Sequence, residues 1–190
     1  MSEIAIIGAG AWGTGLAIVL GRKGRHNVRL WAHETEVCQA INEKRVNVRF
    51  LPGCLIPAGV TATNDLATAL AGAQIVVSVM PSQHCRGLFE RMRPLILPHT
   101  LIVSATKGLE EGSLQRMTEV ISSVLHHSEG SAPAVGALSG PSFAQEVARG
   151  DPTAITIGSS DAELAATAQR EFSDPNFRVY TNDDMVGVEL

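Results

Sequence analysis

The feature that most constrains this chain is a regular alternation of short apolar runs with segments of helical character. Residues 4–7 are all apolar and stop at Gly8, which is typical of a strand buried on both faces of a sheet. Residues 12–23 mix aliphatic side chains with small ones, which favours a helix packed closely on that sheet. The alternation predicts strands at 4–7, 28–31, 60–63, 75–79, 101–105, 134–138, 154–157 and 178–180. It predicts helices at 12–23, 34–44, 64–71, 82–92, 113–125, 142–148 and 162–172, and a further helix from 182. The segment 45–58 is predicted to be a loop.

Strands that alternate with helices form βαβ units, in which neighbouring strands are parallel and the crossing helices cover the sheet. We therefore expect an α/β protein with a doubly wound, mainly parallel sheet and helices on both faces. Four helix starts carry side chains that can cap them: Asn64 or Asp65 for the third helix, Ser82 for the fourth, the Ser142–Gln145 pair as a capping box, and Thr181 or Asn182 for the last helix.

Composition excludes several classes of protein. Hydrophobic residues make up 45% of the 190 residues and charged residues 18%, which is incompatible with intrinsic disorder. No apolar run approaches the roughly 18 residues of a membrane span, and no basic leader precedes the first strand. The three cysteines are widely spaced without a CxxC pattern, and the six histidines form no HExxH. We expect a cytoplasmic protein with no metal site, and the dispersed basic residues argue against nucleic-acid binding.

A glycine-rich motif, GAGAWG at residues 8–13, stands between the first strand and the first helix. In that setting GxGxxG is typical of dinucleotide-binding loops. Gly8 makes the tight turn, Gly10 lets a pyrophosphate approach the backbone, and Gly13 lets helix and strand pack closely. The N–H groups at the helix start attract the phosphates. A plain glycine-rich turn is the alternative, but the strand–loop–helix setting favours a Rossmann-like fold.

Dinucleotide sites of this kind usually carry an acid about 20 residues further on, which holds the ribose 2′-hydroxyl of NAD. Counting from Gly13 leads to Glu34, while His33 stands near the place of the usual strand-end acid. A histidine can accept a 2′-phosphate, whereas an inward Glu34 would repel one. Glu34 is equally well read as a surface acid in the first turn of a helix. The choice between NAD and NADP therefore stays open.

Two further strand ends are expected at the carboxyl edge of the sheet, where open α/β sheets bind ligands. Lys107 follows the strand at 101–105 and can donate to a substrate oxygen or phosphate, unless it is only a solvated loop lysine. Gly140 and Ser142 follow the strand at 134–138, beside a helix start that favours an anion or is merely well capped. His84 lies at a third strand end, where it can touch a nicotinamide, although a lone histidine in such a place is more often without function.

The segments IAIIGAGAWGTGLA, LWAHE, FLPG, SATKGLE, LSGPSFAQE, FRVYTNDD and GVEL occur in this order across essentially the whole chain. Together they resemble the bacterial NAD(P)-dependent glycerol-3-phosphate dehydrogenases. SATKGLE, LSGPSFA and FRVYTND are far more specific than the glycine motif. The resemblance implies reversible hydride transfer between NAD(P)H and C2 of dihydroxyacetone phosphate, which gives sn-glycerol 3-phosphate for phospholipid synthesis.

The resemblance also implies roles for individual residues. Contacts with the dinucleotide are implied for Ala11, Trp12, His33 and Ala144, with weaker positions at Phe50 and His84. Lys107 would touch both cofactor and substrate, and Gly140 and Ser142 would face the substrate. The alternatives are a non-catalytic dinucleotide-binding module and another two-domain dehydrogenase of the β-hydroxyacid or ketopantoate type.

The departure from the family lies at the end of the chain, at Leu190. In the family, GVEL is followed by Gly-Gly-Ala-Leu-Lys-Asn, whose lysine transfers the proton, and then by a helical domain that binds the substrate phosphate. We therefore expect a dinucleotide-binding domain at 1–180, a helix at 181–190 that leads into a second domain, and the proton-transfer lysine beyond Leu190, with no catalytic residue within 1–190. This chain alone is expected to be inactive, and the parent protein can be a homodimer.

Overall fold

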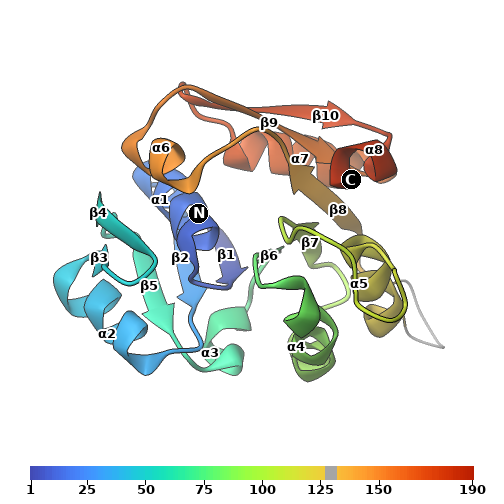
Figure 1. Ribbon diagram of the computed structural model, residues 1–190, viewed down its shortest axis with the longest axis horizontal. Coiled ribbons are helices and arrows are strands. Elements are labelled where there is room, and N and C mark those ends of the chain that lie inside the picture. Colours follow the sequence, from blue (N-terminus) through green and yellow to red (C-terminus); the bar gives the residue numbers. More distant parts are fainter. Residues whose placement is uncertain (127–131) are drawn as a thin grey trace.

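The computed structural model describes residues 1–126 and 132–190, and it contains one large sheet with helices on both sides (Figure 1). The strand order of this sheet is β10-β9-β8-β7-β6-β1-β2-β5. A separate two-stranded sheet pairs β3 with β4. The strands are β1 (Ser2–Ile7), β2 (His26–Trp31), β3 (Val46–Asn47), β4 (Leu51–Leu55), β5 (Val60–Thr63), β6 (Ile75–Ser78), β7 (Leu101–Ser104), β8 (Val135–Ser139), β9 (Thr153–Gly158) and β10 (Phe177–Asn182).

All neighbouring strands of the large sheet are parallel except β8 and β9. The strand order steps outward from β1 in both directions, to β2 and β5 on one side and to β6, β7 and β8 on the other. This confirms the predicted doubly wound, mainly parallel sheet. The pairing of Leu138 with Ile157 reverses the chain direction, so β9 and β10 run opposite to the other strands.

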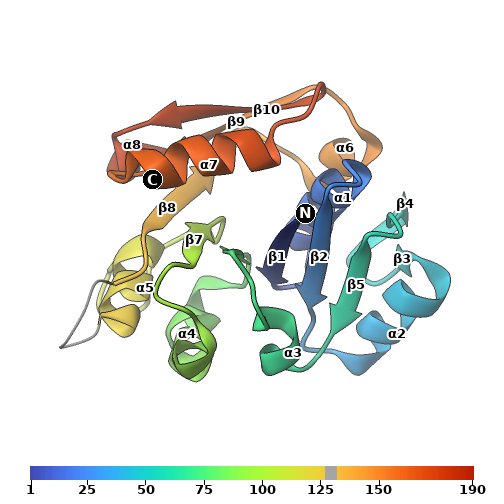
Figure 2. The ribbon, with the colours of Figure 1, turned by 180° about the vertical axis from the view of Figure 1, so that it is seen from behind.

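Helices cover both faces because each central strand is apolar on both. Ile4 and Ile6 of β1 pack into one core with the helices α1 (Ala11–Arg22), α2 (Thr35–Lys44), α6 (Ala144–Arg149) and α7 (Ala162–Phe172). Ala5 and Ile7 point the other way, into a core with α3 (Leu66–Leu70), α4 (Cys85–Met92) and α5 (Met117–Leu125). Figure 2, in which the molecule is seen from behind, shows α7 lying along β9 and β10. No helix among the described residues is long and apolar enough to cross a membrane.

The segment 45–58, predicted as a loop, contains the hairpin of β3 and β4. Pro52 and Gly53 are residue types that favour loops, yet both lie inside β4. Gly53 has φ +79° there. The hairpin is short and irregular, with a register shift at Val46 and Asn47. Asn47 is 1% exposed and is bonded to another segment of the chain, so a tertiary contact stabilises the hairpin.

Three further helix starts differ from the prediction, and one agrees with it. The segment predicted as a helix over 82–92 begins with a 3₁₀ turn at Ser82–His84, and α4 begins only at Cys85, without a side-chain cap from Ser82. The helix expected from residue 113 begins at Met117, because Leu114 has φ +56° and the Glu119 carboxylate accepts from the N–H of Arg116. The expected capping box at Ser142 is wrong, since α6 begins at Ala144 without a side-chain cap. The expected cap of α3 is confirmed, because Asp65 accepts from the N–H of Thr68.

The helix predicted over 181–190 begins later than expected. Thr181 and Asn182 belong to β10, where they pair with β9, so neither caps a helix. The helix α8 (Met185–Glu189) is capped instead by Asp184, whose carboxylate accepts from the N–H of Gly187 at 2.9 Å. Leu190 follows the helix as its C-cap, with its N–H donating to the oxygen of Val186 at 3.1 Å. The sheet therefore continues past the predicted boundary at residue 180, and α8 packs on β8 and β9.

Candidate functional site

A cavity of about 380 Å³ lies where β1, β6 and β7 end and where α1 and α6 begin. It is therefore at the carboxyl edge of the parallel strands, where open α/β sheets bind ligands. Seven of the predicted site residues line it. The lining consists of Gly10, Ala11, Trp12, Gly13, Val79, Met80, Pro81, Ala105, Thr106, Lys107, Ser142 and Ala144.

The three glycines of the motif are required for different reasons. A Cβ on Gly8 would collide with the carbonyl oxygen of Val79, and its φ of +122° disfavours any side chain. A Cβ on Gly13 would collide with the carbonyl oxygen of Gly8. At Gly10, by contrast, no atom of the described residues other than Gly10 and its two chain neighbours lies within 4 Å of the place that a Cβ would take. The space above Gly10 is therefore free for a ligand that approaches the backbone.

The start of α1 is electrostatically prepared for an anion. Its N-cap is Gly10, which provides no side-chain cap, and the first turn contains no acidic residue. The helices α3, α7 and α8 are instead capped by aspartates. The first intrahelical bond runs from the N–H of Thr14 to the oxygen of Gly10. The preceding N–H groups of α1 therefore meet the cavity without a capping side chain, as a phosphate-binding helix start requires.

Asn47 fixes the glycine-rich loop to the β3–β4 hairpin. Its Nδ2 donates to the oxygen of Ala9 at 2.9 Å and to Oγ1 of Thr14 at 2.8 Å. Its Oδ1 accepts from the N–H of Phe50 at 3.2 Å. The hydroxyl of Thr14 also donates to the oxygen of Ala9 at 3.2 Å. Sequence reasoning missed Asn47, because its role depends on contacts across the fold and no local pattern marks it.

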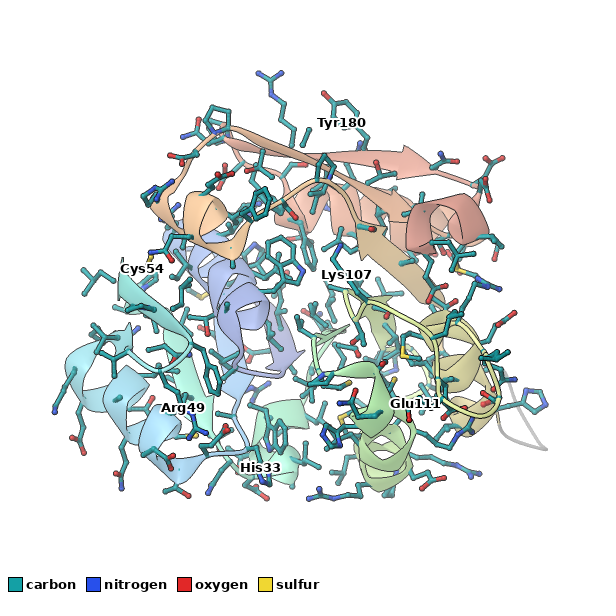
Figure 3. The ribbon with its side chains drawn as sticks, in the orientation of Figure 1. His33, Arg49, Cys54, Lys107, Glu111 and Tyr180 are labelled. Atoms are coloured by element: carbon teal, nitrogen blue, oxygen red, sulfur yellow. The ribbon has the colours of Figure 1, made fainter. Side chains whose placement is uncertain are left out.

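His33 and Glu34, which are predicted at the ribose 2′ position, follow the carboxyl end of β2, and with Phe50 they lie outside the cavity lining. His33 is exposed, and its ring centroid is 6.2 Å from that of Trp31. Oε1 of Glu34 lies 3.7 Å from a guanidinium nitrogen of Arg49. The same guanidinium lies over the ring of Phe50, 5.1 Å from its centroid. Figure 3 shows His33 and Arg49 on the side of α2 and α3, away from Lys107. Sequence reasoning did not single out Arg49.

Lys107 is exposed and lines the cavity just beyond β7. The preceding residue holds its loop in place, because Oγ1 of the buried Thr106 lies 2.9 Å from Oγ of Ser78, at the end of β6. The side chain of Lys107 therefore extends from a backbone segment that is held at the ends of the adjacent strands β6 and β7. A cation there can stabilise negative charge on a ligand oxygen.

The segment after β8 places Ser142 and Ala144 in the cavity wall but not Gly140. Oγ of Ser142 donates to the oxygen of Gly140 at 3.3 Å. A Cβ on Gly140 would lie 3.0 Å from Cα of Ile155, and its φ is +156°. Close packing on β9 therefore accounts for this glycine without a ligand. His84 is exposed at the end of a short 3₁₀ turn (Ser82–His84) and does not line the cavity either.

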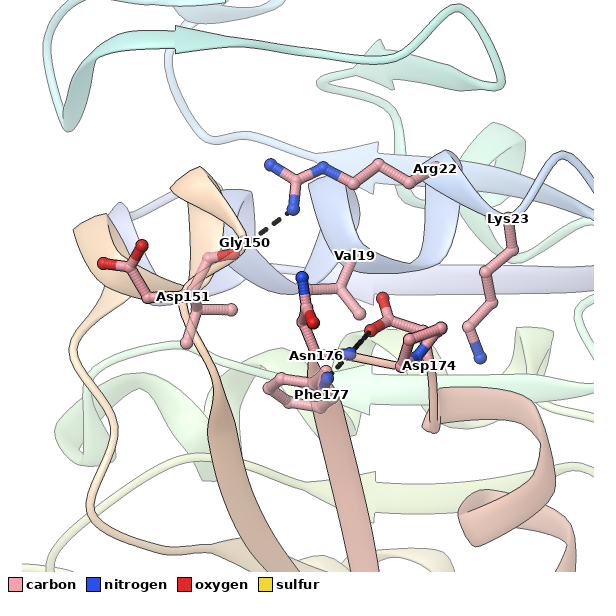
Figure 4. Close-up of a pocket in the computed structure, with 10 residues that line it drawn as sticks. Val19, Arg22, Lys23, Gly150, Asp151, Asp174, Asn176 and Phe177 are labelled. Atoms are coloured by element: carbon pink, nitrogen blue, oxygen red, sulfur yellow. Dashed lines mark hydrogen bonds between the residues drawn. The ribbon is translucent and has the colours of Figure 1, made fainter.

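A second hollow, of about 280 Å³, lies at the far end of α1 (Figure 4). Its two cations already have partners within the fold. Arg22 donates to the carbonyl oxygens of Val147 and Ala148, and Lys23 donates to those of Glu171 and Ser173. Burial and the nearby Arg25 lower the pKa of Lys23 to about 8. These cations stabilise the C-terminal ends of α6 and α7, so the first cavity is the better candidate site.

The lining of the cavity contains no His, Cys, Asp or Glu side chain from the described residues. Among residues 1–126 and 132–190, no three His, Cys, Asp or Glu side chains are grouped so that they could hold a metal ion. Cys38, Cys54 and Cys85 are buried and free. Burial raises the pKa of Cys38, and it raises that of Cys85 to about 12. Thiols that are buried and protonated are poor nucleophiles.

Comparison with known proteins agrees with this geometry. The family model described as the N-terminus of NAD-dependent glycerol-3-phosphate dehydrogenase matches residues 3–165. A glycerol-3-phosphate dehydrogenase [NAD(P)+] of Koribacter versatilis is 60% identical over 190 residues, which are 100% of this chain and 56% of that protein. The corresponding protein of Halorhodospira halophila is 50% identical, over 100% of this chain and 55% of its own length.

Solved structures give the same picture. Glycerol-3-phosphate dehydrogenase from Coxiella burnetii superposes with a TM-score of 0.91 at 39% identity, over 99% of this chain and 56% of that one. The Plasmodium falciparum enzyme gives 0.90 at 26% identity, over 99% and 54%. A ketopantoate reductase from Ralstonia eutropha gives 0.71 at 22% identity, over 98% and 58%, which shows a shared fold only.

The chain spans about half the length of the curated relatives that it matches. The matched region lies at the N-terminus of the family, and it contains both the glycine-rich loop and the strand ends that form the cavity. The chain therefore belongs to the NAD-dependent glycerol-3-phosphate dehydrogenase family, as a representative of its N-terminal domain.

Proposed function

We propose that residues 1–190 bind NAD(H) or NADP(H), with the pyrophosphate lying over Gly10 at the start of α1. The observation that carries this proposal is the contrast among the three glycines. Gly8 and Gly13 have protein atoms where a Cβ would be, whereas the corresponding space at Gly10 is empty and opens beside the cavity. A glycine without an internal packing reason, at an uncapped helix start, fits close approach of a phosphate to the backbone.

In this proposal the other site residues lie along the dinucleotide, at the adenosine end, at the pyrophosphate and at the nicotinamide end. His33, Glu34 and Phe50 surround the adenosine end, beside β2, and Trp12 and Ala11 lie next to the pyrophosphate. Lys107, Ser142 and Ala144 face the nicotinamide end, with Gly140 shaping the turn behind them. When bound, the nicotinamide supplies the hydride chemistry. The protein's part is to orient the cofactor, and Lys107 offers positive charge to the reacting oxygen.

We propose further that the parent protein interconverts dihydroxyacetone phosphate and sn-glycerol 3-phosphate in the cytoplasm, in support of phospholipid synthesis. The family membership and the cation beside the nicotinamide end support this reaction. Reduction of a ketone leaves an alkoxide that must be protonated. We assign that proton transfer to no residue of this chain. We place it beyond the position of Leu190, in the part of the relatives that this chain does not span.

The test is a titration of the 190-residue chain with NADH and NADPH, followed by cofactor fluorescence or calorimetry. Gly10→Val should abolish binding while leaving the unfolding transition nearly unchanged, because the place of its Cβ is open apart from the two neighbouring residues in the chain. Gly87→Val is the matched control, since Gly87 also has open space at its Cβ but lies in α4. Equal binding by Gly10→Val and the wild type would refute the site.

The proposed reaction has its own assay. NADH oxidation at 340 nm in the presence of dihydroxyacetone phosphate should be undetectable for the 190-residue chain and clear for a full-length relative. General acid–base help alone is worth about 10²–10⁴ in rate, and positioning of the substrate contributes further. Robust turnover by the chain itself would place the proton donor within residues 1–190 and make Lys107 the first candidate.

A further inference from the structure

We infer that Arg49 is a specificity-determining residue of the dinucleotide site, and that it enables this chain to accept the 2′-phosphate of NADP(H) despite Glu34. The inference rests on the proposed function and deepens it. Its basis is the juxtaposition of one cation with two acids and an aromatic ring at the carboxyl end of β2. The residues concerned are Glu34, Glu36, Arg49 and Phe50.

The position of Arg49 is set by the hairpin that carries it. Asn47 ties the hairpin to the oxygen of Ala9, inside the glycine-rich loop. The same amide accepts from the N–H of Phe50, so the residues that follow it are held near the loop as well. Arg49 therefore reaches the end of β2 from a segment anchored to the phosphate-binding loop. In dinucleotide folds this strand end is where the adenosine ribose lies.

The contacts of Arg49 neutralise the acid that would repel a 2′-phosphate. One guanidinium nitrogen is 3.7 Å from Oε1 of Glu34, and the other is 2.8 Å from Oε1 of Glu36. With a 2′-hydroxyl, Glu34 can act as the acceptor that this fold commonly provides. With a 2′-phosphate, the guanidinium can exchange its carboxylate partner for the phosphate, which guanidinium groups bind through paired hydrogen bonds.

The exchange is physically inexpensive because the ion pairs are exposed. The side chains of Arg49 and Glu36 are 53% and 66% exposed, and pairs of this kind contribute little to stability. Glu34 is less exposed, at 26%, and its distance from Arg49 is long. The cation–π contact of Arg49 with Phe50 favours a position of the guanidinium near the strand end and uses none of its hydrogen-bond donors. An exposed cation on an anchored segment suits a site that accepts both cofactors.

The experiment compares NADH with NADPH binding, by calorimetry, for the wild type, Arg49→Ala and Arg149→Ala. Arg49→Ala should weaken NADPH binding about tenfold or more, because a charge-assisted phosphate contact is lost and Glu34 is left unneutralised. NADH binding should change less than about threefold, since no phosphate contact is lost there. Arg149 is the matched control, since it is similarly exposed at 56% and is paired with Asp151 at 2.8 Å, in the last turn of α6.

The same comparison with adenosine 2′,5′-bisphosphate and 5′-AMP isolates the phosphate from the rest of the cofactor. The weakening by Arg49→Ala should be confined to the bisphosphate, and NADPH binding by the variant should depend less steeply on salt. An equal loss for both cofactors, or no loss for either, would overturn the inference while leaving the proposed function in place. Failure of the wild type to bind either cofactor would instead overturn the proposed function, and the inference with it.

Discussion

Asn47→Ala is expected to destabilise the protein more than Asn42→Ala, because Asn47 is buried and Asn42 is exposed. The side chain of Asn47 makes three hydrogen bonds, to Ala9, Thr14 and Phe50, at 2.8–3.2 Å. At about 1 kcal/mol for each bond, the loss is about 3 kcal/mol. Asn47 is 1% exposed, so water cannot easily replace the lost hydrogen-bond partners and does not reduce this loss of stability. For a domain of this size the melting temperature should fall by roughly 6–12 °C.

The assay is urea denaturation of the wild type, Asn47→Ala and Asn42→Ala. Asn42 also bonds through both amide atoms, donating to the oxygen of Ala62 and accepting from its N–H, each at 2.8 Å. It is exposed, so water can take over part of these bonds and the loss should be about 1 kcal/mol. Equal losses for the two variants would refute the argument, because burial would then have no role in the energetics of Asn47.

Two further predictions concern stability. Burial lowers the pKa of His26, and the opposing effect of Glu171 is weaker. The unfolded chain therefore takes up the proton first, and the free energy of unfolding should fall as the pH drops below about 6.5. His26→Gln should flatten the pH dependence of urea denaturation between about pH 7.5 and 5, and an unchanged slope would contradict this. Glu189→Ala should cost about 3 kcal/mol, because its side chain is 4% exposed and its carboxylate accepts from the N–H of Thr118 at 2.8 Å and from Arg116 at 3.0 Å. A melting temperature within about 2 °C of the wild type would show that these contacts of Glu189 contribute little to stability.

The strands of the central sheet could be predicted because each is apolar on both faces. Ile4 and Ile6 pack on one side of β1 and Ala5 and Ile7 on the other, so the sequence signal is an unbroken apolar run. The reversal at β9 could not be predicted, because a buried strand has the same composition in either direction. Its direction depends on the pairing with β8, which is a property of the assembled sheet.

The candidate site was predictable to the extent that it depends on backbone turns. The glycine-rich loop and Lys107 are next to clear strand ends, and the structure places them around one cavity. Asn47, Thr106 and Arg49 were not predictable, because each acts through a partner distant in sequence. The hairpin that carries two of them has the sequence pattern of a loop, since proline and glycine dominate it locally.

The packing of α1 beside α6 brings the negative ends of two helix dipoles close together. The two helices run side by side in the same direction: Gly15 is packed against Ala144 at one end, where a Cβ would lie 3.3 Å from its oxygen, and Arg22 bonds to Val147 and Ala148 at the other. Parallel dipoles repel, and the repulsion is relieved by a cation between their negative ends. Arg22 is that cation. Arg22 therefore acts as the shared counterion of two helix ends on the side away from the cavity, so removing its charge would leave two negative helix ends side by side.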